Sequence, residues 1–227
     1  MSIQSEEPTS DSALVPQAWT EVWIKALSQP SAETYQDFVS RPGVSSRRAY
    51  IWVFLGALVG SALWLLGILF FTSWSALGVK QPSDLVGVYA FLIPAYTCLV
   101  PLGGLIAILN LIFRAGISQV IARALGGSGT YTELSYAFGA YLAPLGIVGG
   151  ALSLVPFLNC LTILVGIYSL FLNILAIRSV HRFGWGKALV SSVGILALII
   201  MFLTGAVIVV LVVLGPAIGN VFSNIIQ

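Results

Sequence analysis

The sequence AYIWVFLGALVGSALWLLGILFFT, residues 49–72, carries no charged side chain. About 20 consecutive apolar residues are enough for an α-helix to cross the roughly 30 Å hydrocarbon core of a bilayer. Trp52 and Trp74 lie near the two ends of the stretch, as in the aromatic belts of membrane proteins. We therefore predict a membrane-spanning helix here, with a tryptophan at each membrane interface.

Four further apolar stretches follow along the chain. Of all residues, 58% are hydrophobic and only 8% are charged, whereas a soluble domain carries roughly 25% charged residues. A soluble fold of this size could not cover its surface with so few charges. We predict an all-α fold, a polytopic transmembrane helical bundle of five spans within residues 49–214, at 49–72, 87–113, 135–157, 160–177 and 188–214.

Prolines lie inside two of the predicted spans. The second span contains Pro94 and Pro101, and the third contains Pro144. Because proline removes a backbone hydrogen bond and clashes with the preceding turn, we expect a kink or a broken helix in the second span.

Small and amide side chains predict contacts between spans. Gly56 with Gly60, and Gly146 with Gly150, have the GxxxG spacing that lets helices approach closely, either within one bundle or between two copies. Asn173 lies inside the fourth span, where we expect it to hydrogen bond to a neighbouring helix.

The residues outside the spans form a leading segment and a short tail. Residues 1–15 are polar and acidic, and we predict that they are disordered. Residues 16–48 are predicted to be a cytoplasmic, amphipathic helical segment with Trp19 and Trp23 on one face. That face lies either in the membrane interface or against the protein's own bundle. Residues 215–227 form the tail.

The basic residues fall almost entirely on one side of this topology. With five spans, Lys80 alone lies on the far side. The positive-inside rule therefore predicts a cytoplasmic N-terminus and a C-terminus outside the cell or in a lumen. The other basic residues are Lys25, Arg41, Arg47, Arg48, Arg114, Arg123, Arg178, Arg182 and Lys187.

The longest loop between spans covers residues 114–133. Its first part carries an apolar stripe that continues the second span as a surface helix, and Gly126-Gly127-Ser128-Gly129 ends that helix. Thr130 and Glu133 have the spacing of a capping box, so a new helix should start near residue 131. The glycines are not expected to bind a nucleotide, because no lysine follows them in the phosphate-loop pattern and no strand precedes them.

The five predicted spans contain no Asp, Glu, Lys, Arg or His. Catalysis needs a pair or triad of polar groups, and ionisable groups in a membrane mark proton relays and ion paths. We therefore predict no enzymatic activity, no cofactor and no metal. Cys98 and Cys160 lack metal-binding spacing, and no dense basic patch predicts nucleic-acid binding. His181, the only histidine, is expected to have a lipid-headgroup or surface role at a membrane edge.

The stretch RALGGSGTYTELSYAFGAYLAP, residues 123–144, resembles the Yip family of five-span membrane proteins, which are named for interaction with Ypt/Rab GTPases. Bacterial members share a Gly-Gly-x-Gly loop, then a Tyr and a Pro inside the third span. Residues 168–181 and the tryptophan-rich helix before Pro30 are also similar to the family.

The resemblance implies a bacterial-type member located in a bacterial inner or internal membrane. The eukaryotic branch implies roles in vesicle trafficking and membrane shaping. Eukaryotic members carry an Asp-Leu-Tyr-Gly-Pro-type motif before the first span. This chain lacks the motif, which makes a GTPase partner doubtful.

Two functions from different classes fit these features. The first is a non-enzymatic membrane scaffold that recruits partners or organises the membrane. The second is a passive transporter, channel or lipid-translocating protein that uses the interrupted second and third spans. The expected partners are membrane lipids and either other membrane proteins or further copies of the chain. The candidate interaction or structural residues are Trp19, Trp23, Arg123, Gly126, Gly127, Gly129, Tyr131, Glu133, Tyr141, Pro144, Asn173, Arg178, His181 and Arg182.

Overall fold

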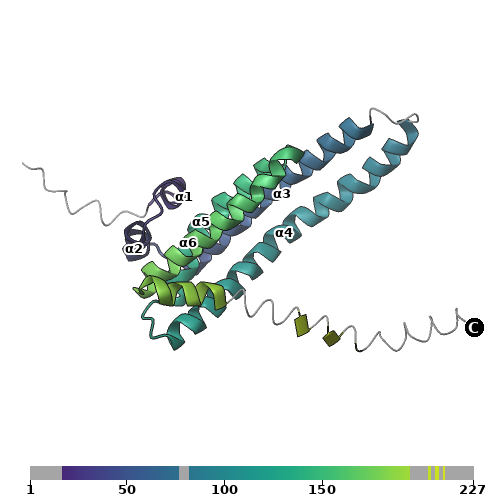
Figure 1. Ribbon diagram of the computed structural model, residues 1–227. Helices are drawn as coiled ribbons and strands as arrows, with labels where there is room; N and C mark the ends of the chain where they lie inside the picture. Colours follow the sequence, from purple (N-terminus) through teal and green to yellow (C-terminus); the bar gives the residue numbers. More distant parts are fainter. Residues whose placement is uncertain (1–16, 77–81, 195–203, 206–207, 210–211, 213–227) are drawn as a thin grey trace, which may run out of the picture.

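The computed structural model describes residues 17–76, 82–194, 204–205, 208–209 and 212, and these residues form helices and short connections (Figure 1). Residues 185–194 make a helix that follows α6. The preceding elements, in chain order, are α1 (Trp19–Ser28), α2 (Ala32–Ser40), α3 (Ser46–Ala76), α4 (Pro82–Ala124), α5 (Tyr131–Leu152), the 3-10 helix η2 (Pro156–Leu161) and α6 (Thr162–His181).

Among the described residues, four helical segments are long and apolar enough to cross a membrane. They are Ser46–Phe71, Ile93–Ala124, Tyr131–Leu152 and Phe157–His181. They coincide with the first four predicted spans, so the all-helical membrane bundle is confirmed. Most of the predicted fifth span, 188–214, lies outside the described residues, apart from its first part in the helix of residues 185–194.

The second span differs from the prediction in its bounds and its continuity. Helix α4 begins at Pro82 and runs without interruption through Pro94 and Pro101 to Ala124. Of the two expected alternatives, the broken helix is therefore wrong, because each proline removes only one backbone hydrogen bond from a helix that keeps its other bonds. The kink stays a prediction. The predicted helical continuation beyond residue 113 is confirmed.

Helices α3 and α5 run parallel and touch through glycine. A Cβ atom on Gly56 would overlap the backbone of Ala143, and one on Gly60 would overlap Gly146. Gly150 in turn lies against the backbone of Gly60. The GxxxG spacing therefore serves close packing within one bundle. Helices α3 and α4 both continue past the end of α5, and they extend farther than the turn between α5 and α6 (Figure 1).

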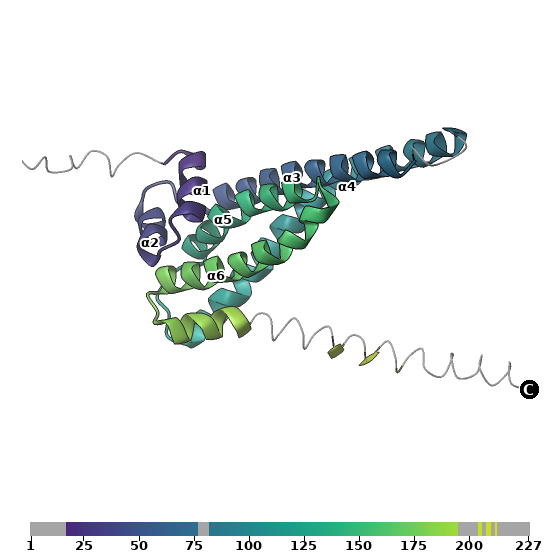
Figure 2. The same cartoon turned by 45° about the horizontal axis from the view of Figure 1, so that its top comes forward.

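Helix α5 is the centre of the bundle. It contacts α1, α2, α3, α4 and α6, and most of its first half is buried. Helix α4 packs on α3 from another side, with Gly104 against the ring of Phe54. Figure 2 shows α6 and the helix of residues 185–194 on the side of α5 away from α3.

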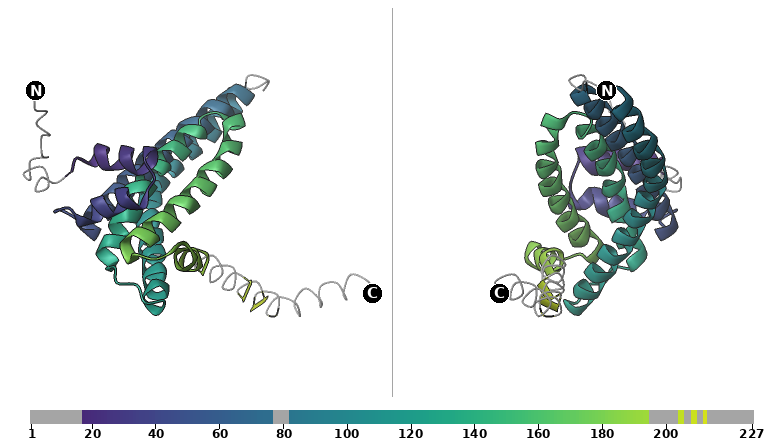
Figure 3. Two further views of the ribbon diagram at one scale, coloured as in Figure 1. Left: turned by 60° about the vertical axis from the view of Figure 1, so that its left-hand side comes forward. Right: turned by 90° about the vertical axis from the view of Figure 1, so that its right-hand side faces the viewer.

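The N-terminal helices pack on this bundle. Val22 and Ala26 of α1, and Tyr35 and Phe38 of α2, are buried, and Figure 3 shows both helices beside the bundle. Of the two arrangements open from the sequence, packing on the protein's own bundle is the observed one. Within the two helices, an ion pair joins Lys25 to Glu21 at 2.8 Å.

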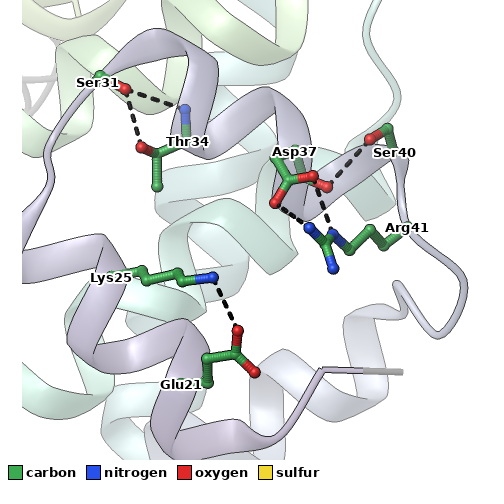
Figure 4. A network of polar contacts seen from close by, with 7 residues as sticks. All are labelled: Glu21, Lys25, Ser31, Thr34, Asp37, Ser40 and Arg41. Atoms are coloured by element: carbon green, nitrogen blue, oxygen red, sulfur yellow. Dashed lines mark hydrogen bonds and ion pairs between the residues drawn. The ribbon is translucent and has the colours of Figure 1, made fainter. Parts of the chain in front are cut away.

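Polar contacts also fix the bounds of α2 (Figure 4). The Ser31 hydroxyl accepts a hydrogen bond from the Thr34 amide at 3.0 Å and so caps the start of the helix. Arg41 forms an ion pair with Asp37 at 2.8 Å at the helix end. Helix α2 is thereby closed at both ends by its own side chains.

Trp52 does not lie at a lipid interface. It is fully buried, with Trp19 and Trp23 meeting its ring edge-on and the Arg48 guanidinium 5.1 Å from the ring centroid. The prediction for Trp52 is wrong because α1 folds back and covers this part of α3. The side chain of Trp74 lies outside the described ones.

Candidate interaction site at the basic end of the bundle

Helix α4 ends at the glycine loop in a Schellman motif. The Gly126 amide donates to the Arg123 carbonyl at 3.0 Å, and the Gly127 amide donates to the Ala122 carbonyl at 2.8 Å. Gly126 has a φ of 87°, in the left-handed region that a side chain makes costly. This conformation is the physical reason for the first glycine of the loop.

The remaining loop glycines are needed for contact with the end of α6. A Cβ atom on Gly127 would lie 2.6 Å from Nδ1 of His181, and one on Gly129 would lie 2.5 Å from the Val180 carbonyl oxygen. Two side chains hold Gly129: its amide donates to Nδ1 of His181 at 3.2 Å, and its carbonyl accepts from Gln119 at 2.8 Å. The loop, which leads from α4 to α5, is thus held in place by side chains of α4 and α6.

His181 is a buried part of this contact. Its side chain stacks on Phe183, and the residue is only 2% exposed. The predicted surface role for His181 is therefore wrong, because the glycine loop covers the ring. Since Nδ1 accepts a hydrogen bond, the neutral ring carries its proton on Nε2, and that atom has no hydrogen-bond partner among the described residues.

The start of α5 is closed by the predicted capping box. The Glu133 carboxylate accepts from the Thr130 amide at 2.8 Å, and the Thr130 hydroxyl accepts from the Glu133 amide at 3.3 Å. The hydroxyl of Tyr131 lies 3.0 Å from that of Tyr50 on α3. The first turn of α5 is therefore stabilised by its own capping box and by a hydrogen bond to α3.

The end of α6 forms a second left-handed turn, with a non-glycine residue in it. Arg182 has a φ of 53°, and the next amide, of Phe183, donates to the Arg178 carbonyl at 3.0 Å. The Arg178 guanidinium lies 4.5 Å from the ring centroid of Trp185. Lys187 donates to the Leu125 carbonyl at 3.0 Å, which places a cation at the C-terminal end of α4.

We call Arg123, Arg178, Arg182 and Lys187 the basic end. The ion pairs among the described residues are Lys25–Glu21 and Arg41–Asp37, so none of these four cations has a carboxylate partner there. Glu133 is nearby, but its carboxylate caps α5. The basic end therefore presents unpaired positive charge beside the half-exposed ring of Trp185.

The structure places the predicted residues in four parts of the molecule. The loop glycines, Arg123, Glu133, Arg178, His181 and Arg182 meet at the basic end. Tyr141 and Pro144 are buried in the middle of α5, and Trp19 and Trp23 surround Trp52. Asn173 donates to the Ser192 hydroxyl at 3.1 Å, which confirms the predicted bond between helices.

Sequence reasoning missed several side chains at this site. Gln119 and Phe183 hold the glycine loop in place, and Trp185 stacks under Arg178. These side chains come from segments that are far apart in the sequence. Hydrophobic periodicity describes neighbours along one helix and therefore does not predict such contacts. Trp185 could have been noticed as a tryptophan within a run of basic residues.

A comparison with known protein families assigns the chain to a family. A family model described as the Yip1 domain matches residues 24–208. The chain belongs to the Yip1 domain family. In this Yip1-domain protein, the match includes both the glycine loop and the whole basic end. No curated protein and no solved structure matches the chain.

The chemistry available at the basic end of this Yip1-domain protein is binding by charge and stacking. Within the described part of the chain, no group of three His, Cys, Asp or Glu side chains could hold a metal ion. The one carboxylate and the one imidazole at the site, Glu133 and His181, both hydrogen bond to backbone amides. The side chains that remain free to meet a partner are cations and an aromatic ring.

Proposed function

We propose that this Yip1-domain protein is a non-enzymatic membrane scaffold that recruits other membrane proteins through its basic end. The observation that carries the proposal is the contrast between the fixed interior and the free surface of that end. Gly129 is held on both sides, whereas Arg123 and Arg182 are exposed and unpaired among the described residues. Such a rigid, charged surface suits the binding of a partner.

The proposed topology has five spans, with residues 188–214 as the fifth. The N-terminus lies in the cytoplasm, the C-terminus lies outside, and the membrane is a bacterial inner or internal one. Support comes from the charge distribution, because only Lys80 would lie on the far side. The basic end then faces the cytoplasm, where peripheral and membrane partners can reach it.

Site-specific photo-crosslinking in native membranes tests the scaffold proposal. A photoreactive amino acid replaces Arg182 or Trp185 in the full chain, and the matched control carries it at Phe70, an exposed position on α3. We expect a defined protein adduct from the basic-end positions and not from Phe70. Equal labelling from all positions, or no adduct from a chain that is monomeric in lipid, would overturn the proposal.

A groove favours passive solute or lipid movement as a second candidate function. It has a volume of about 410 Å³ and lies where the glycine-rich faces of α3 and α5 meet the start of α6. Ser61, Asn159 and Thr162 supply polar groups, and Trp64 forms part of the wall. Flux of ions, small solutes and labelled lipids into proteoliposomes tests this function. A Ser61→Phe variant should block any flux that uses the groove, whereas a chain that transports none of these would exclude the function.

A further inference from the structure

Helix α4 carries an apolar groove close to the basic end. It has a volume of about 330 Å³, and its lining side chains are all apolar. Gly116 leaves open space at its centre, because a Cβ atom there would meet nothing within 4 Å. The lining residues, called the α4 groove below, are Ile112, Phe113, Gly116, Ile117, Val120 and Ile121.

The face of α4 that carries the groove ends in a cation. Arg123 follows Val120 by three residues, which places both on the same face of the helix. Lys187 reaches the same helix end through its hydrogen bond to Leu125. A molecule lying along the α4 groove would therefore meet positive charge at one end and apolar side chains along the rest of its length.

The helix of residues 185–194 borders this face and turns apolar side chains outward. A Cβ atom on its Gly194 would lie 3.0 Å from Cδ1 of Ile121, so the helix lies beside the groove. Its Ala188 is buried, whereas Leu189 and Val190 are exposed. On α4, Val120 is 70% exposed. Exposed apolar side chains beside the groove are expected where lipid is the solvent.

We propose that the α4 groove and Arg123 bind one phospholipid with an anionic headgroup. An acyl chain lies in the groove over Gly116, and the phosphate lies at Arg123 with Lys187 and Arg182 close by. The charge pattern supports this assignment, because an apolar groove with cations at one end is complementary to the acyl chain and the anionic headgroup of a phospholipid. The inference needs the membrane bundle but not the scaffold role, so each can fail without the other.

Native mass spectrometry of the full-length protein, exchanged into phosphatidylglycerol or phosphatidylcholine, tests the headgroup site. The wild type should retain one phosphatidylglycerol in preference to phosphatidylcholine. Arg123→Gln should weaken that retention about fivefold, the effect of one cation near an anionic lipid. The matched control Arg47→Gln removes an exposed cation on another helix and should change nothing. An equal effect of both variants, or none from Arg123→Gln, would overturn the site.

Gly116→Leu tests whether the α4 groove holds the acyl chain, because the added side chain fills the groove where the structure has open space. Retention of phosphatidylglycerol should be lost while the melting temperature stays near that of the wild type. Inorganic phosphate at millimolar concentration should not displace the lipid. Displacement by phosphate would show that the cations bind a free anion, and would overturn the lipid assignment.

The chain's own residues 195–214 are the competing occupant of the α4 groove, since they follow directly after Gly194. Ile117→Cys combined with Leu198→Cys, in a background where Cys98 and Cys160 are serine, tests this possibility. If the lipid occupies the groove, oxidation should give little disulfide in native membranes. Efficient disulfide formation would show that the chain itself fills the groove and would overturn the proposal.

Discussion

The Gly129 amide donates a hydrogen bond to Nδ1 of His181 across 3.2 Å, and this contact fixes the loop between α4 and α5 to the end of α6. The two residues are 52 positions apart in the sequence. The contact requires a glycine, because a side chain at position 129 would meet Val180. It also requires an imidazole whose Nδ1 carries no proton.

Replacing Gly129 with alanine should destabilise the bundle by about 1–3 kcal/mol, the usual cost of forcing extra atoms into a packed site. The new methyl group would lie 2.5 Å from the Val180 carbonyl oxygen. Unfolding in detergent by a denaturing surfactant measures the change. Gly166→Ala is the matched control, since its Cβ would meet nothing within 4 Å, and it should be neutral or stabilising. A Gly129 variant as stable as this control would show that the loop is not held as described.

Replacing Arg182 with glycine should stabilise the protein by about 1 kcal/mol, because glycine adopts the left-handed conformation without the steric cost that arginine has there. Arg182→Ala is the control and should give no such gain, since alanine has a Cβ atom too. The same unfolding measurement applies. If both variants were stabilised equally, the effect would come from removing a charge rather than from the backbone.

Replacing Gly150 with alanine should separate α3 from α5 and destabilise the bundle by about 1–3 kcal/mol. A Cβ atom there would overlap the backbone of Gly60. The neighbouring Gly149 has open space around its Cβ position, so Gly149→Ala should be tolerated. Thermal melting in the same detergent compares the two variants. Equal melting temperatures would contradict parallel packing through these glycines.

Alkaline pH should weaken the docking of α2 through Tyr35. Burial raises the pKa of this phenol, and the negative charge of Tyr141 and Tyr168 in their ionised form raises it further. A pKa that is higher in the folded state than in the unfolded state gives a stabilisation that is complete below the unfolded value of about 10. That stabilisation is lost as the pH rises above 10.

The Tyr35→Phe variant checks this prediction. The Tyr35 hydroxyl has no hydrogen-bond partner among the described residues, so the variant should fold at neutral pH. Tryptophan fluorescence between pH 8 and 12 reports the release of Trp19 and Trp23 from Trp52. The wild type should show a larger alkaline change than the variant. Identical profiles would assign the change to other tyrosines.

Local signals in the sequence predicted much of this fold. Runs of apolar residues gave the first four spans, and the Thr130–Glu133 spacing gave the start of α5, because both depend only on neighbours along the chain. The grouping of basic residues in three segments also indicated one charged end, and the hydrogen bond from Lys187 to the Leu125 carbonyl joins two of these segments.

Contacts between distant segments account for what the sequence did not predict. The residues next to His181 in the sequence do not indicate that it is buried. Its ring is covered by the glycine loop before α5. Trp52 has the position of an interfacial tryptophan until α1 folds over it. The prolines of α4 are a different case, because their local effect is real but too small to end a long apolar helix.

The central position of α5 has a consequence for how the chain enters the bilayer. Its mean hydropathy is 1.3, against 2.3 for the spanning segments of α3 and α6. As an isolated segment, α5 therefore has the weakest tendency of these four described spans to partition from the translocation channel into lipid. The glycine surface of α3, synthesised earlier, offers it a protein partner. Insertion of the third span should then depend on the first hairpin already being in the membrane.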